Sequence, residues 1–256
     1  MASDAEKQRS EQMLSEMLGV ASQVIIRRTS DLLSKYLPVK YDHVVFVRMT
    51  PLQIKVYNAF MASKEVKDAI RQSEDAEKGG QMPLKQITTL KKLCNHPSLV
   101  DTTELDSFST LLPPDYDPKT VQPIFSGKLH LLEKMLRQIK QTTDDKVVLI
   151  SNYTQTLDLF ERLCRQRGWG SLRLDGTMTI SKRQKLVDTF NQPEAPEFVF
   201  LLSSKAGGCG LNLVGANRLV LFDPDWNPGA KRFFFSSFFW GPCCFVGLTS
   251  FFLSSQ

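Results

Sequence analysis

Cysteine is scarce in this chain, and its five cysteines do not form a paired framework. This excludes the class of disulfide-stapled secreted domains, in which cysteines are dense and even in number. The first ten residues, MASDAEKQRS, also lack the apolar run of a secretory signal. We therefore expect a reducing, intracellular setting.

Charge of one sign is not concentrated either. The chain has 32 basic and 27 acidic residues spread along its length, which gives a net charge of +5. This is unlike the dense positive charge of a histone-like binder, and it permits contact with nucleic acid without predicting it. The hydrophobic content of 42% is ordinary for a chain that buries a core, so we expect most of the chain to fold.

A P-loop is also lacking. The motif G-x-x-x-x-G-K-[ST] is needed because backbone N–H groups cradle the phosphates and the lysine neutralises them. The only Gly-Lys pair is Gly127–Lys128, which is followed by Leu129 and has Gln122 where the first glycine should be. The chain also has no Asp-Glu dipeptide to hold magnesium.

The residues that are present divide into three parts, at 1–120, 121–230 and 231–256. In the first part, apolar residues at helical spacing predict an amphipathic helix over 13–26 that packs on something larger. The β-branched run at 43–49 predicts a strand, and Thr50, Pro51 and Gln53 give a helix start at Pro51. A further helix is predicted over 84–94, and the acidic, proline-rich stretch 101–123 is predicted to be a linker.

The second part alternates helices with short strands that are apolar throughout. Such strands are typical of a parallel sheet with helices on both faces, so the fold class is α/β, with a mostly helical region before the sheet. Function in such a sheet lies in the loops beyond the carboxyl ends of its strands. The predicted helices are 129–139, 154–167 and 180–190, and the predicted strands are 146–151, 171–174, 198–203 and 218–222.

Two of these loops are distinctive. The strand 198–203 runs into a glycine loop, Ser203 to Leu213, whose glycines let the backbone approach a ligand closely. With Lys205, such a loop can hold phosphate, although from the glycines alone a tight turn without a ligand is an equally good interpretation. The next strand ends in the polar segment Asp223 to Pro228.

In order and spacing these segments resemble the second RecA-like lobe of the SWI/SNF-like superfamily of helicase-related DNA translocases. The resemblance covers roughly residues 1 to 229 and is greatest for the radiation-repair motor of homologous recombination. It is carried by Ile26–Thr29, Leu37–Lys40, Leu93–Pro97, Ser126–Leu129, Ser151–Thr156, Leu174–Thr177 with Arg183, Ser203–Leu213 and Asp223–Pro228.

The resemblance implies roles for residues in these loops. Ser204 corresponds to a family residue that contacts a DNA phosphate, and Lys205 lies beside it. Such contacts fix the register on DNA without reading its sequence. The loop residues Tyr153, Thr154 and Gln155 are further candidates for the DNA backbone, although Thr154 also suits an N-cap. The residues implied to lie near the nucleotide between the two lobes are Gly207, Gly208, Gly210 and Asn212.

Two other sites are weighed and set aside. Cys94 and His96 invite a metal site, but no other Cys or His is near in sequence and a structural zinc needs four ligands. A buried local cap at a helix end is the preferred interpretation. Trp226 follows Asp223 and Asp225 closely and is expected to pack the loop against the sheet rather than to stack on a base. We predict no metal site.

The third part departs from the family. Family members continue into a helix with an arginine finger, but here Arg232 is the only arginine after Arg218, and eight of the 17 phenylalanines follow it. The uncharged stretch is about long enough for a membrane anchor, but its Phe, Ser, Leu and Pro content favours translated intron or frame-shifted sequence. We expect a disordered or unpacked tail that makes the chain poorly soluble.

The resemblance implies a fragment of an ATP-dependent double-stranded-DNA translocase that acts in DNA repair by homologous recombination in the nucleus. Without a P-loop, acidic pair and arginine finger the fragment is expected to be inactive alone, with ATP and magnesium used only by the complete motor. Its implied partners are double-stranded DNA and the recombinase filament. The alternatives are a non-enzymatic DNA- or partner-binding module that competes with the full motor, and a tail-anchored membrane protein.

Overall fold

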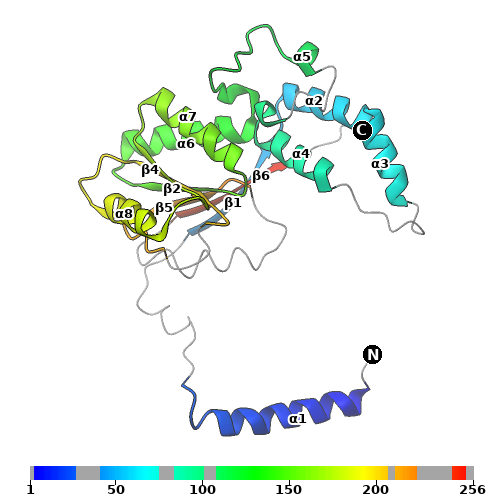
Figure 1. Cartoon of the computed structure of the whole chain (residues 1–256), viewed down its shortest axis with the longest axis vertical. Helices are drawn as coiled ribbons and strands as arrows, with labels where there is room; N and C mark the ends of the chain where they lie inside the picture. Colours follow the sequence, from blue (N-terminus) through cyan, green and yellow to red (C-terminus); the bar gives the residue numbers. More distant parts are fainter. Residues whose placement is uncertain are drawn as a thin grey trace. The chain divides into compact units, whose positions relative to one another are not determined.

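The computed structural model describes residues 3–26, 41–74, 84–100, 108–206, 211–223 and 244–251, and the chain divides into two units, 1–37 and 38–256. The first unit holds the helix α1 (Asp4–Ala21), drawn in blue in Figure 1. It begins earlier than the apolar pattern predicts because Ser3 and Glu6 form a capping box. Its apolar side chains, such as Met13 and Met17, are exposed.

Six parallel strands form one sheet in the second unit, in the order β1-β6-β5-β2-β4-β3. The strands are β1 (Tyr41–Arg48), β2 (Val147–Ser151), β3 (Ser171–Leu174), β4 (Val199–Ser203), β5 (Arg218–Leu221) and β6 (Cys244–Phe251). Helix α6 (Gly127–Thr142) precedes β2, α7 (Thr154–Arg167) connects β2 to β3, and α8 (Ile180–Asn191) connects β3 to β4. The predicted parallel α/β lobe is confirmed.

Helices cover both faces of the sheet. Helices α6 and α7 lie on one face and α8 lies on the other (Figure 1). Leu132 of α6 and Phe160 of α7 belong to one core cluster, and Phe190 of α8 belongs to the other. Because both faces are covered, β2 and β4 are buried at every position, which accounts for their continuous apolar sequences.

The region before the sheet is mostly helical, as predicted. It holds α2 (Pro51–Ala62), α3 (Lys64–Glu74), α4 (Leu84–Asn95), a short α5 (Phe108–Leu111), and the 3₁₀ turns η3 (Pro97–Leu99) and η5 (Pro123–Phe125). Helix α2 begins where Thr50 accepts a hydrogen bond from the backbone N–H of Gln53 (3.2 Å). Val56, Phe60 and Leu93 form the core between α2 and α4. The strand predicted in this region, β1, joins the sheet of the lobe.

Part of the tail departs from the unpacked state that the sequence predicts. Residues 244–251 form β6, which pairs in parallel with β1 and β5. Its sequence, CFVGLTSF, carries no charged residue. No helix in the described part of the chain is both long enough and apolar enough to cross a membrane.

Candidate nucleic-acid interface at the carboxyl edge of the sheet

Three loops leave the sheet at its carboxyl edge and are tied to one another through the backbone. The N–H of Ser204, after β4, donates to the carbonyl oxygen of Ser151 at the end of β2 (3.0 Å). On the other side of β2, the N–H of Phe222, after β5, donates to the carbonyl oxygen of Ile150 (3.0 Å). The loops that carry the predicted DNA contacts therefore emerge side by side.

The predicted DNA-contacting residues lie on two of these loops and in the first turn of α7. Lys205, Thr154 and Gln155 are exposed, and Ser204 and Tyr153 are half-buried. Tyr153, rather than Thr154, is the N-cap of α7, and its carbonyl oxygen accepts hydrogen bonds from the next turn. The N-cap alternative for Thr154 is therefore wrong, because Thr154 is already the first helical residue.

The predicted nucleotide-contacting residues are only partly within the described chain. Asn212 is exposed, and its backbone carbonyl accepts a hydrogen bond from Nδ2 of Asn191 on α8 (2.7 Å). Gly207, Gly208 and Gly210 lie outside the described residues, as do Trp226 and Lys231–Cys243. Arg183 is half-buried and donates to the carbonyl of Ala206 at the start of the glycine loop (3.4 Å).

Behind this edge is a buried polar group that we call the Asp223 cluster. Its members are Asn95, Lys128, Ser151, Asn152, Thr156 and Asp223. The Asp223 carboxylate accepts hydrogen bonds from Nδ2 of Asn95 (3.0 Å), from the hydroxyl of Ser151 (2.8 Å) and from the N–H of Asn152 (2.9 Å). Nδ2 of Asn152 donates to the backbone carbonyl of Asp223 (2.9 Å). The ends of β2 and β5 are thus locked together by side chains.

Lys128 supplies the positive charge of the Asp223 cluster. Its Nζ donates to Oδ1 of Asn95 (2.6 Å) and to the carbonyl oxygen of Phe222 (3.1 Å). Burial lowers the pKa of Lys128, and the negative charge of Asp223 opposes that shift. Burial likewise raises the pKa of Asp223, opposed by its bonds to Asn152 and Ser151 and by the charge of Lys128. Each charge therefore offsets part of the effect of burial on the other, although for Asp223 the hydrogen bonds from Asn152 and Ser151 contribute more than the charge of Lys128.

The position of Lys128 bears on nucleotide binding. A P-loop lysine must reach a phosphate, but Lys128 is only 4% exposed and its ammonium group is bonded to Asn95 and Phe222. The described residues therefore do not fit a nucleotide as a P-loop would, in agreement with the failed motif in the sequence.

His96 is a local cap, as predicted. It is the N-cap of η3, where its Nδ1 accepts the N–H of Ser98 (3.1 Å), and its Nε2 lies 3.2 Å from the carbonyl oxygen of Gln122. The Gln122 carbonyl requires a proton on Nε2, and Nδ1 must carry a lone pair to accept the N–H of Ser98, so the ring is neutral. Burial lowers the pKa of His96 to about 4. Among the described residues, no three His, Cys, Asp or Glu side chains are grouped so that they could hold a metal ion.

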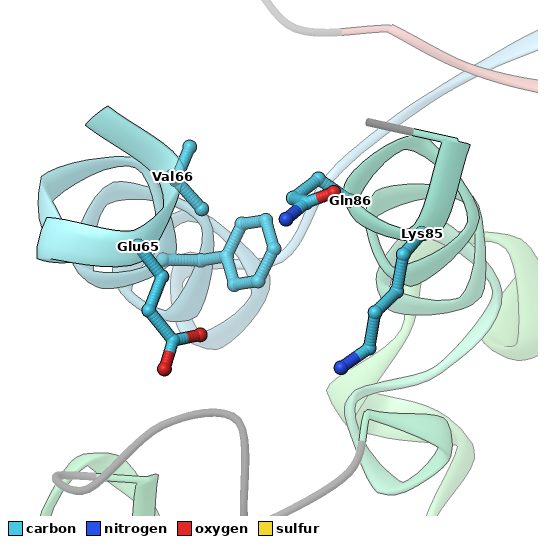
Figure 2. Close-up of a pocket in the computed structure, with 5 residues that line it drawn as sticks. Glu65, Val66, Lys85 and Gln86 are labelled. Carbon is cyan, nitrogen blue, oxygen red and sulfur yellow. The ribbon is translucent and has the colours of Figure 1, made fainter. Parts of the chain in front are cut away.

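A small hollow in the helical region is too narrow for a ligand. Figure 2 shows Glu65 and Val66 of α3 facing Lys85 and Gln86 of α4 across it. The cavity has a volume of about 10 Å³, room for one water molecule at most. Among the described residues, Oε1 of Gln86 is buried without a hydrogen-bond partner, and a single water would satisfy it.

Sequence reasoning missed the Asp223 cluster, although it noted every segment that contributes to it. In the sequence, Lys128 belongs to the failed P-loop match. In the segment 93–97, Cys94 and His96 are the candidates for a site, and Asn95 between them is not. The sequence does place a polar residue at the end of an apolar run at Ser151 and at Asp223, which could have pointed to a polar cluster there. Which of those residues meet depends on how α4, α6 and the sheet pack together.

Two family profiles match the chain and together cover most of it. The profile described as "SNF2-related domain" matches residues 2–99, and that described as "Helicase conserved C-terminal domain" matches residues 127–233. With the parallel sheet and its carboxyl-edge loops, these matches define a helicase-type C-terminal lobe. The chain thus carries segments that match both an SNF2-related domain and a helicase conserved C-terminal domain.

The chain is also similar to curated DNA repair and recombination proteins. It is 54% identical over 237 residues to the DNA repair protein rhp54 of Schizosaccharomyces pombe, which covers 90% of this chain and 27% of that protein. It is 53% identical to RAD54 of Saccharomyces cerevisiae (90% of this chain, 26% of that protein) and 53% identical to the RAD54-like protein of Mus musculus (89% and 31%). The chain thus spans less than a third of the length of these relatives.

Solved structures support the fold. The C-terminal part of the Fun30 ATPase domain matches with a TM-score of 0.64 at 24% identity, covering 84% of this chain and 85% of that one. The Sulfolobus solfataricus SWI2/SNF2 ATPase core in complex with dsDNA matches with a TM-score of 0.61 at 20% identity, covering 92% and 47%.

Proposed function

We propose that this chain is a fragment of an ATP-dependent double-stranded-DNA translocase that acts in DNA repair by homologous recombination, and that it supplies the second motor lobe. In the complete motor, ATP and magnesium bind between the two lobes, and the partners are duplex DNA and the recombinase filament, in the nucleus. The observation that carries this proposal is the 52–54% identity to RAD54-type repair proteins over nearly the whole chain.

The carboxyl edge is the surface we propose for DNA. Lys205, Thr154 and Gln155 are exposed there, and Ser204 is held beside β2 by its backbone bond to Ser151. Hydroxyl, amide and ammonium groups of this kind suit phosphate oxygens rather than base edges. Asn212 and the glycines 207, 208 and 210 are proposed to lie toward the nucleotide. A single lobe offers few phosphate contacts, so binding should be weak and indifferent to sequence.

Fluorescence anisotropy with a labelled duplex, repeated over a series of salt concentrations, tests this surface. Each phosphate contact contributes roughly one unit to the slope of log affinity against log salt, so Lys205→Gln should lower that slope by about one. The matched control is Lys140→Gln, which removes an exposed lysine from the last turn of α6, at the opposite edge of the sheet. Equal slopes for the two variants, or tight binding at high salt, would count against the proposal.

The chain itself should not hydrolyse ATP. Its sequence has no P-loop and no Asp-Glu pair, and Lys128 is buried in the Asp223 cluster. Phosphate release measured with duplex DNA should equal the no-protein blank. The same absences favour a second candidate function, a binding module that competes with the complete motor for DNA. Titrating this chain into an assay of a complete relative separates the two, because only a competing module lowers the relative's rate.

A further inference from the structure

The Asp223 cluster reaches from the helical region to the loop after β2, and that connection has a functional consequence. We propose that Lys128 and Asn95 are positioning residues for the DNA-facing segment 152–155, which joins β2 to the first turn of α7. They hold this segment in place through Asp223 and do not themselves touch DNA. This inference rests on the proposed DNA-binding function of that loop.

The first step is the orientation of the Asn95 amide. An amide side chain has an oxygen that accepts and a nitrogen that donates, whereas an ammonium group only donates. Nζ of Lys128 lies 2.6 Å from Oδ1 of Asn95, so it holds the oxygen end toward itself. The nitrogen end is then directed at Asp223 (3.0 Å) and at the hydroxyl of Thr156 (3.2 Å).

The second step carries the constraint to the loop. The bonds from Asn95 and Ser151 both fall on Oδ2 of Asp223, which leaves Oδ1 directed at the N–H of Asn152 (2.9 Å). Charge-assisted bonds of this kind are stronger and more directional than neutral ones. Asn152 precedes the N-cap Tyr153, so the carboxylate fixes the backbone just where the loop turns into α7.

The three side chains that hold this segment, those of Asn95, Lys128 and Asp223, come from three different regular elements. Asn95 ends α4, Lys128 lies in the first turn of α6, and Asp223 follows β5. Each is attached to a regular element, and supports of this kind hold a site more exactly than loops do. Ser126, just before α6, also donates to the backbone carbonyl of Asn95 (2.6 Å). The helical region is thereby connected to the proposed DNA surface.

The chain contains a matched control for this inference. Lys146 is also buried, and its Nζ also makes two hydrogen bonds, to the carbonyl oxygens of Phe190 (2.9 Å) and Gln192 (2.6 Å). Each lysine also lies over a phenylalanine ring, Phe222 for Lys128 and Phe190 for Lys146. Lys146 precedes β2, so it lies at the opposite, amino edge of the sheet.

The experiment compares Lys128→Met, Lys146→Met and Asn152→Ala with the unaltered full chain. Duplex-DNA affinity is measured over a salt series, and amide hydrogen exchange is measured at Asn152 and in the β3–β4 ladder. We expect Lys128→Met and Asn152→Ala to weaken DNA binding roughly three- to tenfold, the effect of losing about one hydrogen bond. The salt slope should not change, because no phosphate contact is lost. In Lys128→Met, the backbone N–H of Asn152 should exchange faster than in the unaltered chain. The backbone N–H groups of the β3–β4 ladder should exchange at an unchanged rate.

Each other outcome decides the question. A folded Lys128→Met chain with unchanged affinity overturns the inference, and so does an equal loss of affinity in Lys146→Met, which would indicate general destabilisation. If Lys128→Met does not fold, Asn152→Ala tests by its affinity and slope whether Asp223 holds this segment, because it keeps the backbone N–H bond to Oδ1 of Asp223 but removes the bond from Nδ2 to the Asp223 carbonyl. Its side chain is only half-buried, so the variant should fold. If the unaltered chain does not bind duplex DNA, the proposed function fails, and the exchange rate of the Asn152 amide still tests the positioning contacts.

Discussion

At the scale of single residues, His96 gives the chain a pH dependence with a definite sign. Its pKa in the folded protein is lowered from 6.5 to about 4, chiefly by burial. Between these two values the unfolded chain binds a proton that the folded chain does not, so the free energy of unfolding falls as the pH falls from 6.5 through 4. The loss on reaching pH 4.5 is roughly 2–3 kcal/mol.

Urea unfolding at pH 7 and pH 4.5 measures this loss. We expect His96→Asn, which keeps a side chain suited to capping η3, to be less stable at pH 7 but to lose roughly 2–3 kcal/mol less on acidification than the unaltered chain. The control is His43→Asn, which replaces a histidine that is exposed on β1 instead of buried. A His96→Asn chain that loses as much as the unaltered one would show that other groups cause the dependence.

The residue scale also shows what sequence can predict about the site. Lys205, Thr154 and Gln155 were predicted because each follows a strand within a recognisable loop, and all three are exposed at the carboxyl edge. Asn95 was not predicted as part of the site, since it is 128 positions from Asp223, to which it donates a hydrogen bond. Contacts across such a separation are set by packing, not by local pattern.

At the scale of elements, the contact of α6 with β1 sets a strict requirement at Gly127. A Cβ atom at this position would lie 2.0 Å from the carbonyl oxygen of Arg48 and 3.1 Å from Cγ1 of Val47. The obstacle is backbone, so one of the two elements must shift. Gly127→Ala should therefore lower the free energy of unfolding by about 2–3 kcal/mol, the scale of an overpacked core, despite the better helix propensity of alanine.

Chemical denaturation of Gly127→Ala beside Gly176→Ala tests this requirement. Gly176 follows β3, and a Cβ atom there would meet nothing within 4 Å, so its replacement should change stability by less than about 0.5 kcal/mol. Similar small effects at both positions would show that α6 can move away from β1 at little cost.

Elements were predicted well where both of their ends are encoded locally. Helix α7 has the predicted bounds, since Gly168 ends it in the left-handed conformation with φ of +66°. Helix α3 was not predicted because its sequence, KEVKDAIRQSE, is mostly charged and Val66 is its core residue. Strand β6 was not predicted because its partners are β1, far back in the sequence, and β5.

At the scale of the whole molecule, the pairing of β6 with β1 and β5 leads us to expect that this part of the tail stabilises the lobe. In the described sheet β1 lies at the edge and pairs with β6, which lies between β1 and β5. Removing β6 therefore separates β1 from β5 and the rest of the sheet. Strand β5 would then keep β2 as a neighbour but lose β6, so it would become the edge strand of the sheet. A chain that ends at residue 243 should be less stable than the full chain, whereas a chain that ends at 251 retains every described strand.

Thermal unfolding of the full chain beside chains 1–243 and 1–251 measures the contribution of β6. Losing an eight-residue strand that pairs on both sides should cost several kcal/mol, and at about 2–4 °C per kcal/mol for a chain of this size the Tm of 1–243 should fall by about 10 °C or more. The Tm of 1–251 should match that of the full chain. If 1–243 instead unfolds at the same temperature with a higher soluble yield, the segment behaves as an unpacked, aggregation-prone tail, and β6 does not contribute to the stability of the lobe.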